Sequence, residues 1–227
     1  MVTLVVPGAS MAQTIWNGSG GDSNWSTGAN WVGGAAPPSS ITSFVQFGLP
    51  SGNFTPNADS PWTLDRLDIS GATSYALTGS ALTFDGTSPQ INTGGATHSI
   101  ANDISLAATT SFTTGSNLTL SGAISGTVGM DKSGAGTLTL TQVPTHTGLT
   151  TISAGTLNIG GGGALTGGVG GDIVNNGALV IDSSGGISLN SLSGTGTLIK
   201  NGSGLLVSGA TWTHSGDTTI NGGSIAN

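Results

Sequence analysis

The carboxylates of this sequence do not form an acid–base pair. All ten acidic residues are aspartates, and the closest approach to a pair is Asp65 with Asp68, which flank Arg66. On a β-strand, positions three apart face opposite sides. General acid–base work needs two groups that reach one reacting centre. We therefore expect no catalytic residue here.

Histidines are the next candidates. His146 and His214 occupy equivalent positions of a repeat with a 68-residue offset, which is described below. If the repeat spans about three turns of a stacked fold, they lie roughly 14 Å apart along the stack. That separation is too long for one metal ion, so we expect a shared role in a turn. His98 has no acidic or histidine neighbour at ligand spacing, and no metal site is expected.

Other enzyme and cofactor motifs are missing as well. Polysaccharide-acting β-helix enzymes need clustered carboxylates with basic and aromatic groups, whereas the basic residues here are only Arg66, Lys132 and Lys200. The glycine-rich run 160–168 lacks the lysine and following helix of a phosphate loop, and no following aspartate completes a calcium-binding Gly-Gly-x-Gly-x-Asp repeat. The sequence predicts a protein that is not an enzyme and holds no cofactor.

The composition favours short strands and export. Charged residues make up 6% of the 227 residues, glutamate is absent and glycine occurs 41 times, so good helix formers are scarce. The net charge of −7 leaves no basic face for nucleic acid. No apolar run approaches the roughly 20 residues of a membrane helix, and no cysteine occurs.

A repeat organises the C-terminal half. Residues 132–159 align without gaps on 200–227, and 11 of the 28 pairs are identical. Inside each copy, apolar residues alternate with Thr, Ser or Asn, the pattern of a strand with one buried face. The predicted inward columns contain Leu138, Leu140, Ile152, Leu157, Ile159, Leu179, Ile181, Leu198 and Leu206.

Such strands predict a solenoid. Each turn has too few apolar side chains to close its own core, so it must stack on neighbours with the same spacing. We expect an all-β, right-handed parallel β-helix of about 8–10 rungs, in which the 68-residue unit divides into three turns of about 22–23 residues. The rungs are expected over 63–227, with the clearest copies at 120–187 and 188–227.

The N-terminal third differs in composition. Trp16, Trp25 and Trp31 fall within 16 residues, and six of the eight prolines lie between Pro37 and Pro89. Large aromatics cannot recur in every rung of a narrow solenoid but suit its end, so 13–62 is interpreted as an N-terminal cap. Residues 1–12 resemble the end of a signal peptide, with a small-x-small site before Gln13, or form an N-terminal strand.

Two segments resemble a known family. Residues 132–140 and 147–157 are close to the consensus of the autotransporter-associated β-strand repeat of bacterial passenger domains, and 200–225 resembles a second, degraded copy. The resemblance covers roughly 13–227. It implies a β-helix that is secreted or displayed on the bacterial cell surface and serves as stalk, adhesin or scaffold. It carries no catalytic residue over to this chain.

Partners follow from the same interpretation. The sequence stops inside a repeat, so the chain is expected either to belong to a longer surface protein or to associate end to end, because an open solenoid end is a template for another strand. Two other functions stay open. Trp16, Trp25 and Trp31 could stack on glycans as a carbohydrate-binding module, and outward threonines such as Thr137 and Thr139 could form an ice-binding array.

Overall fold

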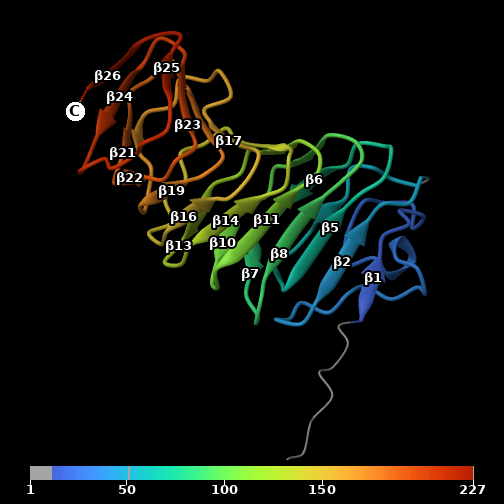
Figure 1. Cartoon of the computed structure of the whole chain (residues 1–227). Helices are drawn as coiled ribbons and strands as arrows, with labels where there is room; N and C mark the ends of the chain where they lie inside the picture. Colours follow the sequence, from blue (N-terminus) through green and yellow to red (C-terminus); the bar gives the residue numbers. More distant parts are fainter. Residues whose placement is uncertain (1–11, 51, 227) are drawn as a thin grey trace, which may run out of the picture.

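The protein is a parallel β-solenoid of about nine turns, as the computed structural model of residues 12–50 and 52–226 shows (Figure 1). Within each sheet, all neighbouring strands run parallel. The only helical element in the described residues is a 3-10 helix, η1 (Gly28–Asn30). This confirms the predicted all-β solenoid. The prediction for residues 1–12 lies outside the described residues, apart from Ala12.

Three faces surround the core. Sheet 1 has nine strands in the order β1 (Gln13–Ile15), β2 (Phe44–Phe47), β5 (Arg66–Ile69), β8 (Gln90–Thr93), β11 (Thr110–Thr114), β14 (Met130–Ser133), β16 (Thr150–Ile152), β19 (Ile173–Asn175) and β22 (Leu192–Ser193). Its first two strands lie inside 13–62, so this segment already contributes strands to the ladder.

From β2 to β22, each strand of sheet 1 is followed in the chain by a strand of sheet 2. Its nine strands are β3 (Asn57–Ala58), β6 (Ala76–Gly79), β9 (His98–Ile100), β12 (Leu118–Leu120), β15 (Thr137–Leu140), β17 (Thr156–Ile159), β20 (Ala178–Asp182), β23 (Thr197–Asn201) and β25 (Thr218–Ile220). Residue i of one strand is paired with a residue 19 to 22 positions later in most turns, as from Leu118 to Leu138, Leu157 and Leu179.

The third face is divided. Sheet 3 consists of β4 (Trp62–Leu64), β7 (Leu82–Phe84), β10 (Ile104–Leu106) and β13 (Ile124–Gly126), and sheet 4 of β18 (Gly167–Gly168), β21 (Ile187–Leu189), β24 (Leu205–Ser208) and β26 (Ser224–Ala226). Between them, residues 141–149 cross this face without forming a strand. They still stack, because Thr145 N donates to Ile124 O at 2.9 Å.

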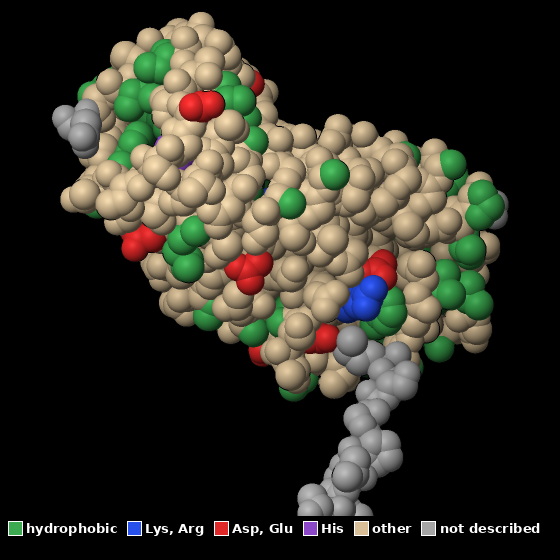
Figure 2. All heavy atoms as spheres, in the orientation of Figure 1, with side chains coloured by type: hydrophobic (Ala, Val, Ile, Leu, Met, Phe, Trp, Pro, Cys, Tyr) green, Lys and Arg blue, Asp and Glu red, His purple; other side chains and the backbone are tan. Residues whose placement is uncertain are grey.

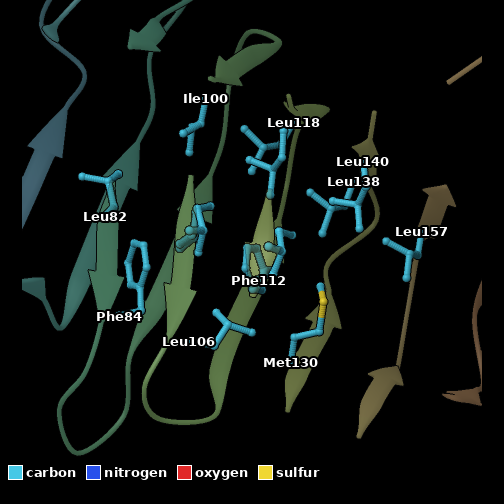
Figure 3. Close-up of a cluster of buried hydrophobic side chains, with 14 of the residues drawn as sticks. Leu82, Phe84, Ile100, Leu106, Phe112, Leu118, Met130, Leu138, Leu140 and Leu157 are labelled. Carbon is cyan, nitrogen blue, oxygen red and sulfur yellow. The ribbon is translucent and has the colours of Figure 1, made fainter. Parts of the chain in front are cut away.

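Alternation of side chains builds the core. On each strand the apolar residues point inward and stack on the equivalent residues of the turns above and below, as Figure 3 shows for Leu118, Leu138 and Leu157. Burial of apolar surface at about 25 cal/mol per Å² is the main stabilising term of such a column. The predicted inward residues are all at most 1% exposed: Leu138, Leu140, Ile152, Leu157, Ile159, Leu179, Ile181, Leu198 and Leu206.

The repeat does not divide into three equal turns, so that prediction was wrong. Turns are mostly 19 to 22 residues long, and an offset of 68 residues therefore spans three turns and one further face. Residues 130–140 occupy β14 in sheet 1 and β15 in sheet 2, whereas the equivalent 198–208 occupy β23 in sheet 2 and β24 in sheet 4. The second copy is rotated around the solenoid by one face.

Candidate functional site

The predicted aromatic candidates form one closed cluster. Trp16 and Trp25 are fully buried and Trp31 is 1% exposed. Trp16 packs edge-on to Trp31 with ring centroids 5.0 Å apart, and Phe47 lies within 6 Å of all three rings. Two of the indole nitrogens bond inside the fold, Trp16 Nε1 to Asn53 O and Trp31 Nε1 to Trp25 O, each at 2.7 Å. In this structure no face of the three rings is open to a sugar.

The remaining tryptophans do not replace them. Trp62 packs on Trp25 at 5.6 Å and is 6% exposed. Trp212 lines a shallow polar hollow over residues 208–212 with Ser208 and Thr211, and its Nε1 donates to Asn190 O at 2.9 Å. This hollow is formed by the end of β24 and the residues after it and has mainly polar walls, so it offers little of the apolar surface on which a sugar ring stacks.

The outward threonines do not form a long array. One column of sheet 2 runs Ser99, Thr119, Thr139, Asn158, Val180, Ile199 and Thr219 across successive turns. Within this column, threonine stands next to threonine only at Thr119 and Thr139, and the neighbouring column pairs Thr137 with Thr156 but then reaches Ala178. The first column then passes through an amide to two apolar side chains, so the regular spacing of the backbone is not matched by a regular surface chemistry.

The charged residues Asp65, Arg66 and Asp68 do not form an acid–base pair in the structure. Arg66 makes a two-pronged ion pair with Asp68 through Nε at 2.9 Å and Nη2 at 2.8 Å, on the outside of sheet 1. Asp65 is 5% exposed at the preceding corner. Among the described residues no group of three His, Cys, Asp or Glu side chains could hold a metal ion.

The histidines have different surroundings. His146 is fully buried, and its Nε2 hydrogen-bonds Thr150 Oγ1 at 2.8 Å, while Nδ1 has no partner. His214, the equivalent residue, is partly exposed and bonds Gly196 O at 2.7 Å. Burial lowers the pKa of the His146 imidazole. The two residues therefore share a place in the sequence repeat but not a set of contacts.

His98 is built into the wall of the solenoid. Its Nδ1 accepts a hydrogen bond from Tyr75 N at 3.2 Å, and Nε2 donates to Gly94 O at 3.1 Å. Both ring nitrogens are thus used by a neutral imidazole, and burial lowers the pKa of His98. The ring holds together two successive corners of the chain.

Two lysines lie inside the core, which sequence reasoning missed. Lys132 and Lys200 are both 0% exposed. Lys132 stands in a column between Phe112 and Ile152 of the neighbouring turns, at a position where an apolar side chain would be expected. The signal was present in the sequence, because each lysine falls on the inward phase of its strand, two residues after Met130 or Leu198.

Each buried ammonium group is held by backbone carbonyls at a corner. Nζ of Lys132 donates to Ser133 O at 2.9 Å, Gly134 O at 3.1 Å and Ala154 O at 3.0 Å. The first two carbonyls belong to its own corner and the third to the corner of the next turn. Burial lowers the pKa of Lys132 to about 8. The lysine therefore links two turns by charge-assisted hydrogen bonds.

Lys200 repeats this arrangement one face further on. Its Nζ donates to Asn201 O and to Gly202 O, the latter at 2.9 Å. Burial lowers the pKa of Lys200, and Asp182 opposes that shift through its charge. No bond to the following turn is present among the described residues, where Lys132 has one.

The lysine corners leave no room for a side chain opposite the ammonium group. Gly155 has φ +66°, and a Cβ built on it would lie 2.8 Å from Lys132 Nζ and 2.2 Å from Gly134 O. Gly223, the equivalent residue, has φ +67° and would meet Gly204 O at 2.2 Å. The identical glycines of the two copies are thus required by close packing of successive corners.

Other corners satisfy their inward carbonyls with uncharged donors. Buried carbonyls need a hydrogen-bond partner, and inward-pointing hydroxyl and amide side chains supply it. Thr114 Oγ1 donates to Gly136 O at 3.1 Å, Asn175 Nδ2 to Thr197 O at 2.8 Å and Ser183 Oγ to Leu165 O at 2.9 Å. The buried polar groups of the solenoid therefore act on its own backbone.

Comparison with known proteins gives one match. The model of the passenger-associated transport repeat matches residues 130–159 and 198–226, which are the two segments with the lysine corners. No curated protein and no solved structure matches the chain. Over the described residues, no helix is long and apolar enough to cross a membrane.

Both matched segments have the same construction. Each contains a strand whose last residue but one is the buried lysine, then a corner, a second strand, a crossing segment without a strand, and two strands that stack on the first two. This agrees with the resemblance found in the sequence. The chain is thus a parallel β-solenoid in which two segments match the passenger-associated transport repeat, a repeat found in autotransporter passenger proteins.

Proposed function

We propose that this chain is a non-catalytic structural segment of a secreted or surface-displayed bacterial passenger protein, serving as stalk or scaffold. The proposal rests on one observation: the side chains that could do chemistry or bind a ligand are buried and bonded to the protein itself. Lys132, Lys200, His98 and His146 are buried and bonded within the fold, and the tryptophan cluster is closed. A spacer needs a continuous core whose polar side chains bond to the fold itself, and it needs no set of reactive groups that meet at one point.

The surface supports the same role. Figure 2 shows a face covered mainly by uncharged polar side chains and backbone, with few charged groups scattered over it. The face shown has no charged region that would attract a nucleic acid or a charged polymer. An adhesive function would have to rest on contacts made by hydroxyl and amide side chains. We therefore propose adhesion only as a second role, after that of stalk or scaffold.

Replacement of the segment in its natural context tests the proposal. Residues 63–226 would be exchanged for an equal number of turns from an unrelated β-solenoid, and display and cell adhesion would be measured on whole cells. A stalk predicts unchanged display and adhesion, because only length matters. Loss of adhesion with normal display would instead identify this segment as the adhesin and overturn the structural role.

End-to-end association is a second candidate, supported by Ile220. This residue continues the inward column of Ile181 and Lys200 in β25, yet it is 52% exposed. An apolar inward side chain on an exposed strand edge is a place for another copy of the chain to stack. Sedimentation of the purified chain tests this: concentration-dependent association that Ile220→Lys abolishes supports it, and a monomer at every concentration contradicts it.

A further inference from the structure

Five asparagines stand in Asn-x-Ser or Asn-x-Thr triplets, the acceptor motif for N-linked sugar. The number of these triplets is close to what a chain this rich in serine and threonine gives by chance, so it carries no weight. The structure adds information that the motif lacks, namely the direction of each side-chain amide. The five residues are Asn17, Asn24, Asn53, Asn117 and Asn201.

All five amides are oriented in the same way. In each, Oδ1 accepts a hydrogen bond and Nδ2 donates none to a described residue. The donors to Oδ1 are Ser19 N for Asn17, Asn57 Nδ2 for Asn24, Thr55 N for Asn53, Thr137 N for Asn117 and Asn221 Nδ2 for Asn201, at 2.7 to 3.0 Å. Asn117 is exposed as a residue, and in the other four, which are half-buried, Nδ2 is not among the buried polar atoms that lack a partner. None of the five nitrogens is therefore sealed inside the core.

The other described asparagines behave differently. Seven of the nine use Nδ2 as a donor inside the protein, and the exceptions are Asn158 and Asn176. The seven are Asn30, Asn57, Asn92, Asn102, Asn175, Asn190 and Asn221. A free, outward Nδ2 is thus a property of the triplet asparagines and not of asparagine in this fold generally.

We propose that these triplets are acceptor sites for N-linked sugar on the folded protein, with Asn117 as the principal site. Asn117 is exposed and directly precedes β12, and Thr119 two residues later points outward on the same strand. Thr137 N donates to Oδ1 at 3.0 Å, which fixes the amide plane and leaves Nδ2 outward. No unfolding is needed to present this group.

The reaction is a transfer to nitrogen. The sugar donor is a hexose or oligosaccharide whose anomeric carbon is bonded to a diphosphate, carried by a nucleoside or by a lipid. Nδ2 of Asn117 forms the new bond to the anomeric carbon, the bond from that carbon to the phosphate oxygen breaks, and the diphosphate leaves with the electron pair. Nδ2 gives up one proton to a base of the transferase.

Asn53 shows a second device for fixing the amide. Thr55 donates to Asn53 Oδ1 twice, from its backbone N at 2.7 Å and from Oγ1 at 2.8 Å. The hydroxyl that defines the triplet thus contacts the asparagine whose nitrogen would react. Asn17 uses the backbone bond from Ser19 at 3.0 Å. These two sites lie together at the N-terminal end of the solenoid, where Trp16 Nε1 contacts Asn53 O.

Asn176 is a natural control for Asn117. It is also exposed, it also lies just before a strand of sheet 2, and its Oδ1 also accepts from the next turn, from Thr195 N at 3.3 Å. It lacks only the hydroxyl residue, because Ala178 stands two positions later. Ala178 is paired with Thr156 and Thr197 in the neighbouring turns, so a threonine fits this column.

The experiment compares these two sites in the full chain recovered from the cells that make it. Intact mass and peptide mapping are expected to show sugar on the Asn117 peptide and none on the Asn176 peptide. Thr119→Ala and Asn117→Gln should each remove the sugar at Asn117, whereas Ala178→Thr should add one at Asn176. Circular dichroism of each variant controls for folding, since all three positions are on the outer surface.

The mass added identifies the donor. A single hexose indicates a nucleotide-activated sugar, and a fixed block of several sugars indicates a lipid-linked one; either result supports the proposal. An unmodified mass for the wild-type chain would overturn it. Sugar on Asn176 of the unchanged chain would also overturn it, because accessibility alone, and not the triplet, would then select the site.

Discussion

The two repeat copies have the same sequence pattern but different surroundings. Residues 130–159 run from sheet 1 to sheet 2, and residues 198–226 run from sheet 2 to sheet 4. The same lysine, glycine and apolar positions therefore build corners on two different edges of the solenoid. The repeat specifies a corner with its two adjoining strands, and it does not specify which face of the solenoid the strands join.

The copies differ in how completely the next turn covers them. Lys132 reaches a carbonyl of the following turn, Ala154 O, and Ile152 above it is fully buried. Among the described residues, Lys200 bonds to its own corner alone, and Ile220, which stacks on it, is 52% exposed. The strength of the lysine corner is thus set partly by the turn that follows it.

Truncation of the isoleucines should separate the copies most strongly. Ile152→Ala removes a fully buried side chain and should lower the free energy of unfolding by about 2–5 kcal/mol. Ile220→Ala removes a side chain that is already half in solvent, so we expect less than about 1 kcal/mol. Urea unfolding followed by circular dichroism measures both. Equal losses for the two variants would show that β25 is covered in solution, and the two repeat copies would then not differ in burial.

The sequence was sufficient for the architecture. Alternation in segments such as 137–141 and the 68-residue self-match predicted short stacked strands, and the inward residues followed from the phase of that alternation. The number of residues per turn could not be derived from the 68-residue repeat. In sequence, an offset of three turns and one further face looks the same as an offset of three longer turns. Only the pairing register, as between Leu118 and Leu138, distinguishes them.

The candidate site was less predictable than the fold. Lys132 and Lys200 were visible as one identical pair of the repeat, but a charged side chain is almost never placed in a core without a partner. Their partners are backbone carbonyls at the corners. Every residue has such a carbonyl, and its direction depends on the backbone conformation of the corner, so the sequence does not reveal it. Asn117 presents the same difficulty, because its amide orientation depends on Thr137 of the next turn.

Replacement of the lysines tests the role of the following turn. Lys132→Met keeps much of the volume but removes three hydrogen bonds to corner carbonyls, and leaving a buried acceptor unpaired costs about 1–3 kcal/mol. Lys200→Met removes two such bonds next to a more open turn, so its loss should be smaller. Thermal and urea unfolding of both variants give the comparison. A larger loss for Lys200→Met would mean that the ammonium group matters more where it makes no bond to the next turn.

Alkaline pH tests the buried charge itself. The pKa of Lys132 falls from 10.5 to about 8 on folding because burial disfavours the ammonium form. Between about pH 8 and 10.5 the unfolded chain binds more protons than the folded chain, so stability should rise with pH across this window. Unfolding free energies measured from pH 7 to 10.5 should show this rise in the wild type and a reduced rise in Lys132→Met. An unchanged slope in the variant would assign the rise to another group.

Acid should act on the first copy through His146. Burial lowers the pKa of this imidazole below its ordinary 6.5, so as the pH falls through about 6.5 the unfolded chain takes up a proton before the folded chain does. The fold therefore loses stability as the pH falls below that value. His146→Gln, which keeps a polar partner for Thr150 Oγ1, should reduce the loss between pH 6.5 and 5, a range above the ordinary titration of the aspartates. Because His98 is also buried with a lowered pKa, the single variant should remove only part of the slope. If His146→Gln leaves the loss of stability between pH 6.5 and 5 unchanged, the folded protein tolerates protonated His146. Its Nδ1, which has no partner in the protein, would then donate to a water molecule.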